Sequence, residues 1–295
     1  LTKQRRVEVH QSEVVLYTAQ RDLASRNGQT TDALRFEVLR ARAHRETDTS
    51  RNEADHYQLD IATLNAIERY YQHIAGIYSA QSSQATDVLE QQKFAVHAAE
   101  ARYQALRSAS VSLRRREYIA DIRKATLDQP DWSEALEIMT EKEGIVQEQH
   151  KSSQALREAG LQRLAARGNF YRVAAERAEA EGRVEDALRY QLWAAKHHRD
   201  AYTMDLHNIV DPLQMGLLPQ GEAVFRDEVE EISQRIQAMI RDRTWSRDAL
   251  SEPPPRQYGR FPNNNHFHRI STVEPFKWNG ELDLDSRQIP GHLFM

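Results

Sequence analysis

Histidine and carboxylate residues stand close together at a few places in the sequence, and such groups are common metal ligands. Glu53 and His56 form a Glu-x-x-His pair, which can supply half of a di-iron site from one helix face. A complete site needs a second such pair on a facing helix, and the sequence contains only this one. We therefore expect no metal to bind there.

Two histidine pairs are the remaining metal candidates. His266 and His268 alternate around a phenylalanine and would share one face of an extended segment, so a metal ion bound by both is conceivable. A polar loop that contains two histidines is the simpler interpretation. His197 and His198 are adjacent, so a helix would point them in different directions. We expect neither a metal ion nor another cofactor.

The motifs of the common enzyme classes are missing. The sequence has no glycine-rich phosphate loop, no Gly-x-Ser-x-Gly and no His-Glu-x-x-His. It also has no cysteine, which excludes a disulfide, a thiolate zinc site and a cysteine nucleophile. We expect a protein without catalytic residues, and the alternative is an enzyme whose active site is assembled from side chains scattered over helices.

A basic run, Arg114–Arg116, could contact phosphates or anionic lipid. Glu117 and Asp121 follow directly, and the whole chain has a net charge of −4. This pattern favours a solvated helix face, or one paired with a neighbouring helix, and it argues against a nucleic-acid partner. No apolar run approaches the roughly 20 residues of a transmembrane helix.

The elements that must position these residues are helices. Before residue 250 the sequence is rich in strong helix formers and nearly free of proline up to Pro212. Apolar residues recur at steps of three and four, as from Leu64 to Tyr78 and from Val229 to Met239. The expected turns and breaks are near Gly28, Ser82, Pro130 and Gly182 and from Pro212 to Pro219. The fold class expected is all-α, with long antiparallel helical hairpins.

One segment recurs within the chain. Residues 28–44 and 182–198 share seven identities in seventeen positions, and fainter copies lie between them. The segments 28–44 and 182–198 both begin with glycine and continue with Asp-Ala-Leu-Arg four residues later. Glycine supplies a tight turn between helices, and a small alanine lets two helices approach closely. We expect Ala187 and Ala194 to face a partner helix, and Trp132 and Trp193 to fill the space between hairpins.

The second copy resembles the tetratricopeptide repeat (TPR). Gly182, Ala187 and Ala194 match its inter-helix glycine and its two packing alanines, which lie seven residues apart. The first copy has Arg40 at the place of the second alanine, and the period exceeds that of the family. The resemblance implies TPR-like hairpins in an α-solenoid or bundle, whereas a generic helix start after a loop is the alternative.

The chain is expected to have three parts: TPR-like hairpins at 1–210, a break plus one amphipathic helix at 211–250, and an extended tail at 251–295. The tail contains several prolines and no periodicity. Its aromatic residues are predicted to anchor in pockets of neighbouring subunits: Tyr258, Phe261, Phe267, Phe276, Trp278 and Phe294. The alternative is a tail that folds back entirely on residues 1–250.

These observations predict a non-catalytic accessory subunit of a large protein assembly. Leu1 in place of methionine suggests a removed targeting peptide, so a mitochondrial location is expected, with a cytoplasmic one as the alternative. The assembly expected is a mitochondrial membrane complex, such as an ATP synthase or a respiratory-chain complex. A lipid-surface-binding helical bundle is the other alternative. The expected partners are other protein subunits, with no nucleic acid and no membrane span.

Overall fold

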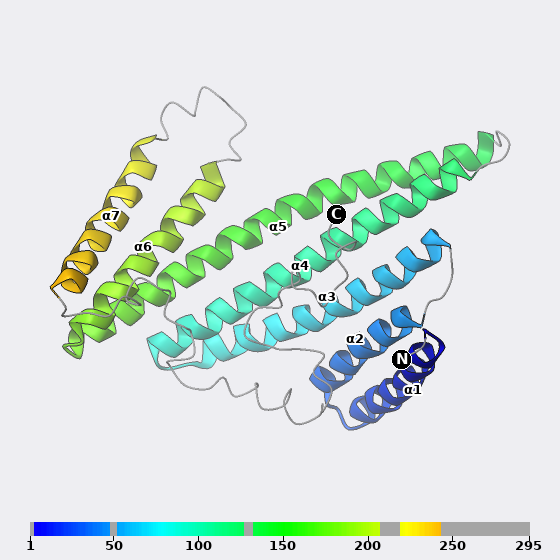
Figure 1. The fold of residues 1–295 in the computed structure, drawn as a ribbon, viewed down its shortest axis with the longest axis horizontal. Coiled ribbons are helices and arrows are strands. Elements are labelled where there is room, and N and C mark those ends of the chain that lie inside the picture. Colours follow the sequence, from blue (N-terminus) through cyan, green and yellow to red (C-terminus); the bar gives the residue numbers. More distant parts are fainter. Residues whose placement is uncertain (1–2, 48–51, 127–131, 207–218, 243–295) are drawn as a thin grey trace. The chain divides into compact units, whose positions relative to one another are not determined.

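The structure, a computed structural model, describes residues 3–47, 52–126, 132–206 and 219–242. These residues form seven helices and no strand, so the all-α prediction is confirmed (Figure 1). The helices are α1 (Lys3–Arg26), α2 (Thr30–Glu46), α3 (Glu53–Gln84), α4 (Val88–Ala125), α5 (Trp132–Ala180), α6 (Val184–Leu206) and α7 (Pro219–Arg241).

The two glycine turns predicted from the repeat are present. Gly28 ends α1 and Gly182 follows α5, each in the left-handed conformation, with φ of 69° and 72°. In each turn the N–H after the glycine donates to an alanine carbonyl, that of Ala24 (2.9 Å) or Ala178 (2.8 Å). This bond closes a Schellman-type helix end. The two copies of the repeat therefore share one local backbone geometry.

The other predicted turns have different outcomes. The α3–α4 turn follows Gln84, close to the predicted Ser82. Pro219 is the first residue of α7, a position that proline favours because a first-turn N–H has no partner within the helix. The turn at Pro130 and the break that begins at Pro212 lie outside the described residues.

Contacts divide the chain into two compact units. Unit 1 comprises residues 1–83 and 97–160, and unit 2 comprises residues 84–96 and 161–295. The long helices α4 and α5 contribute residues to both units.

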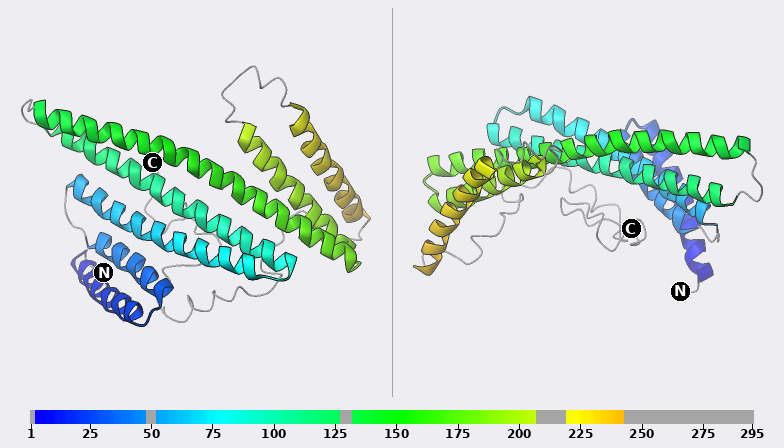
Figure 2. Two further views of the ribbon diagram at one scale, coloured as in Figure 1. Left: turned by 180° about the vertical axis from the view of Figure 1, so that it is seen from behind. Right: turned by 90° about the horizontal axis from the view of Figure 1, so that it is seen from above.

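In unit 1 the helices follow one another in chain order, as the left view in Figure 2 shows. Helix α1 packs on α2. Side-chain bonds join the further neighbours: Arg69–Glu37 between α3 and α2 (2.7 Å), Ser112–Asn65 between α4 and α3 (2.9 Å), and Arg123–Glu141 between α4 and α5 (2.8 Å). Helices α1 and α5 are therefore the two edges of this unit.

The core of unit 1 follows the predicted stripe of α3. Leu64, Tyr71 and Ile74 on this stripe are buried. The facing part of α4 buries several alanines, and their small side chains let long helices pack closely: Ala98, Ala99, Ala101 and Ala105. Burial raises the pKa of Tyr71 well above its ordinary value, so this phenol stays neutral throughout the physiological range.

Unit 2 has two apolar clusters, one on each side of α6. Ala187 and Ala194 lie in the first, packed with residues of α5 such as Phe170 and Ala174, so both alanines face a partner helix as predicted. The second cluster joins α6 to α7 and contains the predicted stripe of α7 from Val229 onward. Helix α6 is therefore the central element of this unit.

The two tryptophans predicted between hairpins differ in outcome. Trp193 is partly buried against the first cluster of unit 2. Trp132 is 80% exposed, so its prediction is wrong. It is the first residue of α5, and the inward line of that helix runs instead through Ile138 and Ile145, which are buried.

Candidate interaction surface

A charged cluster is buried between α2, α3 and α4 of unit 1. The Asp60 side chain is 0% exposed and pairs through Oδ1 with Arg45 Nε, while Arg115 Nε lies 3.6 Å from its Oδ2. The guanidinium of Arg115 also stacks on the rings of Tyr57 (5.0 Å) and Tyr118 (5.8 Å). The arrangement joins three helices through one carboxylate, and its closed surroundings suit a structural role.

A further cation, the partly buried Arg42, adds to the polar core of unit 1. Burial lowers the pKa of Arg42 to about 10, with Arg45 acting in the same direction and Tyr71 opposing it. Arg42 therefore keeps its charge at neutral pH inside the helical layer.

The basic run singled out in the sequence is divided between core and surface. Arg116 pairs with Glu148 of α5 (3.0 Å), which agrees with a face salt-bridged to a neighbouring helix. Arg115 is buried against Asp60, which the sequence reasoning missed. The signal available was Asp60 itself, a charged residue between the apolar stripe positions of α3.

The histidine candidates take structural positions. Glu53 accepts a hydrogen bond from the Tyr57 hydroxyl (2.8 Å), and His56 Nε2 lies 3.4 Å from Arg45 Nη2. His197 stacks on Tyr171, with ring centroids 5.6 Å apart. Across the four described ranges, no group of three or more possible ligands could hold a metal ion. His266 and His268 lie outside these ranges.

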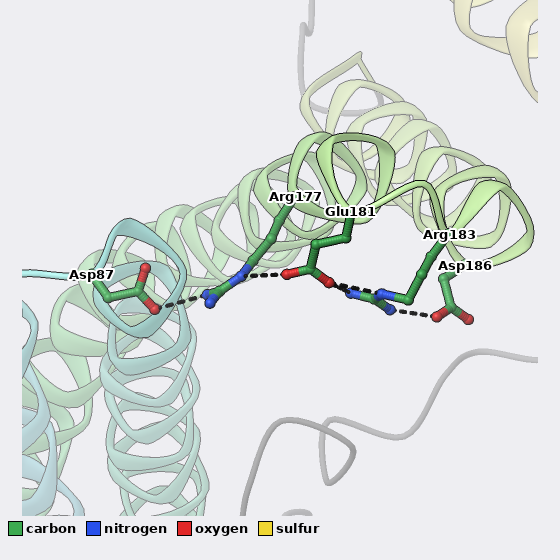
Figure 3. A network of polar contacts seen from close by, with 5 residues as sticks. All are labelled: Asp87, Arg177, Glu181, Arg183 and Asp186. Atoms are coloured by element: carbon green, nitrogen blue, oxygen red, sulfur yellow. Dashed lines mark hydrogen bonds and ion pairs between the residues drawn. The ribbon is translucent and has the colours of Figure 1, made fainter.

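An ion network surrounds the Gly182 turn (Figure 3). Arg177 bridges Asp87 at the start of α4 (3.1 Å) and Glu181 (3.2 Å), and Arg183 joins Glu181 (2.6 Å) to Asp186 (2.5 Å). Hydrogen bonds from Arg183 and Arg177 hold the pKa of Glu181 below its ordinary value. Because these side chains face water, the network orients the turn more than it stabilises the fold.

The outer face of α5 carries an apolar stripe that its own unit does not cover. Trp132, Leu136, Met139 and Val146 are between 47% and 80% exposed. Their spacings of four, three and seven residues place them along one side of the helix. Four large apolar side chains in a row differ from the scattered exposed residues of an ordinary surface.

Helix α1 carries a matching stripe at the opposite edge of unit 1. Val9, Leu16 and Leu23 are seven residues apart, and with Val15 they are 48% to 71% exposed. Ser12 and Ala19, also exposed, lie between them at heptad positions. A different face of α1 buries Ala24. Sequence reasoning missed both stripes, although their heptad spacing was a readable signal.

The predicted anchors of the tail lie outside the described residues, as do all positions from 243 onward: Tyr258, Phe261, Phe267, Phe276, Trp278 and Phe294. No helix in the described part of the chain is long and apolar enough to cross a membrane. Searches with family models, against curated proteins and against solved structures find no match to this chain.

Proposed function

We propose that the protein is a non-catalytic helical scaffold, an accessory subunit that binds other protein chains through exposed helix faces. The observation that carries this proposal is the pair of apolar heptad stripes on α1 and α5. Heptad stripes are the surfaces with which helices recognise other helices, by placing side chains of one into the gaps of the other.

The charge around the α5 stripe favours protein over lipid as the bound surface. Helices that lie on anionic membranes carry Lys and Arg on their polar face. The exposed carboxylates of α5 between residues 132 and 150 are Glu134, Glu137, Glu141, Glu143 and Glu148, of which Glu141 and Glu148 pair with Arg123 and Arg116 of α4. From Trp132 to Val146 the stripe itself contains one charged residue, Glu143, and no Lys or Arg that would attract an anionic membrane.

The two glycine hairpins support a TPR-like origin for the scaffold. Their turns have the same left-handed glycine and the same bond to an alanine carbonyl, at an offset of 154 residues. In the second copy, Ala187 and Ala194 lie on the packing face as a TPR-like hairpin requires. We therefore propose that both hairpins derive from one helical repeat unit.

The assembly we propose is a mitochondrial membrane complex, either an ATP synthase or a respiratory-chain complex, to which the aromatic tail anchors the subunit. Two observations support this proposal: a net charge of −4 suits protein partners better than RNA, and six aromatic residues stand in the last 45 residues of the chain.

Co-purification from the native source under mild conditions tests this function. The full chain is compared with a chain lacking residues 256–295 and with a chain carrying Leu136→Ser and Met139→Ser. Thr140→Ser serves as the control, because Thr140 is exposed but lies off the stripe. We expect the full chain and the control to retain the same partner subunits, and the two altered chains to lose them while staying helical.

Retention of every partner by both altered chains would refute the proposal. Sedimentation with phosphatidylserine vesicles is the second measurement. Binding of the full chain to the vesicles, abolished by the stripe substitutions, would replace the scaffold function with a lipid-surface function.

A further inference from the structure

The two apolar stripes belong to the two edge helices of one unit. Side-chain bonds join α2, α3, α4 and α5 in chain order, and α1 packs on α2 (Figure 1). One stripe therefore faces outward from each edge of unit 1. Such a unit offers two different helix faces to its surroundings, and each could be covered by the other face of a second copy.

The stripes have equal lengths. From Val9 to Leu23 and from Trp132 to Val146 there are fourteen residue steps in each case, or about 21 Å along a helix axis. Heptad positions alternate in both, so an antiparallel pair can place every a position of one helix against a d position of the other.

One antiparallel register brings all positions of the two stripes together. At each apolar layer of this register, a large apolar residue of α5 lies opposite an apolar residue of α1, either large or small. The layers are Val9 with Val146, Leu16 with Met139, Ala19 with Leu136, and Leu23 with Trp132.

The remaining layer of this register explains the one charged residue in the α5 stripe. Glu143 falls opposite Ser12, whose small polar side chain leaves the carboxylate access to water. Pairing α5 with α5 so that Leu136 meets Met139 would instead set Glu143 against Trp132. Pairing α1 with α1 so that Val9 meets Ala19 would set Arg5 against Leu23. The register between different stripes avoids both conflicts, since unpaired charges against apolar groups are costly.

We propose that the occupant of each stripe is a second copy of this chain, with α1 of one copy docked antiparallel on α5 of the next. This inference rests on the proposed scaffold function and names the partner of the same surfaces. The contact joins two different faces, so each dimer keeps one free α1 edge and one free α5 edge. Such contacts build rings where they close and filaments where they do not.

Complementation between two variants of the full chain tests this contact. Leu16→Glu disables α1, and Met139→Glu disables α5. Both positions are exposed, so neither change should unfold the helices. Gln11→Glu and Thr140→Glu are matched controls with the same new charge on exposed positions beside the stripes. Mass is measured by light scattering during size-exclusion chromatography over a wide range of concentration.

We expect the full chain and both controls to reach at least twice the monomer mass, and each stripe variant alone to stay monomeric. An equal mixture of the two stripe variants should form a dimer and stop there. The Met139→Glu copy supplies an intact α1, the Leu16→Glu copy supplies an intact α5, and no second contact is available to extend the dimer.

Three results would overturn the inference: a full chain that is monomeric at every concentration, a mixture that fails to dimerise, or one stripe variant that still self-associates alone. The last result would indicate pairing of like stripes. These failures differ from failure of the scaffold function. If the chain is monomeric but its stripe variants lose other subunits on co-purification, the scaffold function stands and only the self-association is refuted. If the stripe variant and the tail-deleted chain both retain every partner, the scaffold function is refuted.

Discussion

The cores of the two units are built from different chemistry. Unit 1 buries charge: Asp60 is held between Arg45 and Arg115, and Arg42 lies nearby in the same layer of helices. Unit 2 buries apolar and aromatic groups, with Tyr171 at the centre of its stacked rings. Unit 1 therefore adds a buried ion cluster that joins three helices to its apolar core, whereas the described clusters of unit 2 are apolar and aromatic.

The internal repeat allows equivalent positions of the two units to be compared, because each unit contains one copy. Ala187 and Ala33 are equivalent, but the position of Ala194 in unit 2 is taken by Arg40 in unit 1. The turn is the same in both, while the packing face differs. A glycine turn therefore fixes where a hairpin bends and leaves the composition of its core open.

The largest expected effect is the loss of the buried carboxylate in unit 1. Asp60→Asn keeps the shape but leaves Arg45 and Arg115 without their shared counter-charge. Removing one partner of a buried ion pair costs about 3–5 kcal/mol of folding free energy. Urea unfolding followed by circular dichroism measures it.

The matched control is an exposed pair of the same unit. Glu141→Gln removes the partner of Arg123, and both side chains are largely in water. Its effect should stay below about 1 kcal/mol. Equal effects of the two substitutions would mean that the buried cluster does not hold unit 1 together.

Packing in unit 2 should be broken by a larger side chain. Ala187→Trp adds an indole to the closed cluster around Phe170 and Ala174, and overpacking of this kind costs about 1–3 kcal/mol. Val184→Trp, at an exposed position of the same helix, should change stability by less than about 0.5 kcal/mol. The shift of the unfolding midpoint measures both, and equal shifts would contradict the close contact between α5 and α6.

Substitution by alanine at two glycines of α5 should change the stability of the protein in opposite directions. Gly144 lies in unit 1 with open space around it, so Gly144→Ala should stabilise the helix by about 0.5–1 kcal/mol. At Gly168 in unit 2 an added methyl group would collide with the His198 ring. Gly168→Ala should therefore destabilise the protein. The net loss of folding free energy should be about 1 kcal/mol once the gain in helix propensity is included.

A double variant checks the cause of this difference. Gly168→Ala combined with His198→Ala removes the collision, so the alanine at 168 should then become stabilising relative to His198→Ala alone. Thermal unfolding of the four chains gives the coupling between the two positions. Additive effects would place the His198 ring elsewhere.

The smallest expected effect is a change in the stability of unit 2 with pH. Burial lowers the pKa of His198, with Arg172 and His197 acting in the same direction and Glu228 opposing it. The unfolded chain then binds a proton at higher pH than the folded chain, so stability falls as pH decreases below about 6.5. Above that pH, His198 is neutral in both states and contributes no slope.

His198→Gln should flatten this part of the stability profile. Urea midpoints between pH 5 and pH 8, spanning the histidine's ordinary pKa, test this. An unchanged slope would assign the pH dependence to another group. A slope of the opposite sign in the unaltered chain would contradict the lowered pKa.

The sequence by itself determined the helical class, the glycine turns and the inward stripes of α3, α6 and α7. These features are local: a left-handed turn needs glycine at Gly28 and Gly182, and a helix buries what recurs every three to four residues. Ala187 and Ala194 were placed correctly for the same reason, since both belong to one turn-and-helix signature.

Only the tertiary structure decided which helix faces remain uncovered and which charges are buried. Arg115 and Arg116 are neighbours in one basic run, yet one lies in the core and the other at the surface, because a helix turns about 100° per residue. Trp132 begins a stripe that reads like core but faces outward. Periodicity reports that a face is apolar, whereas the neighbouring helices determine whether anything covers it.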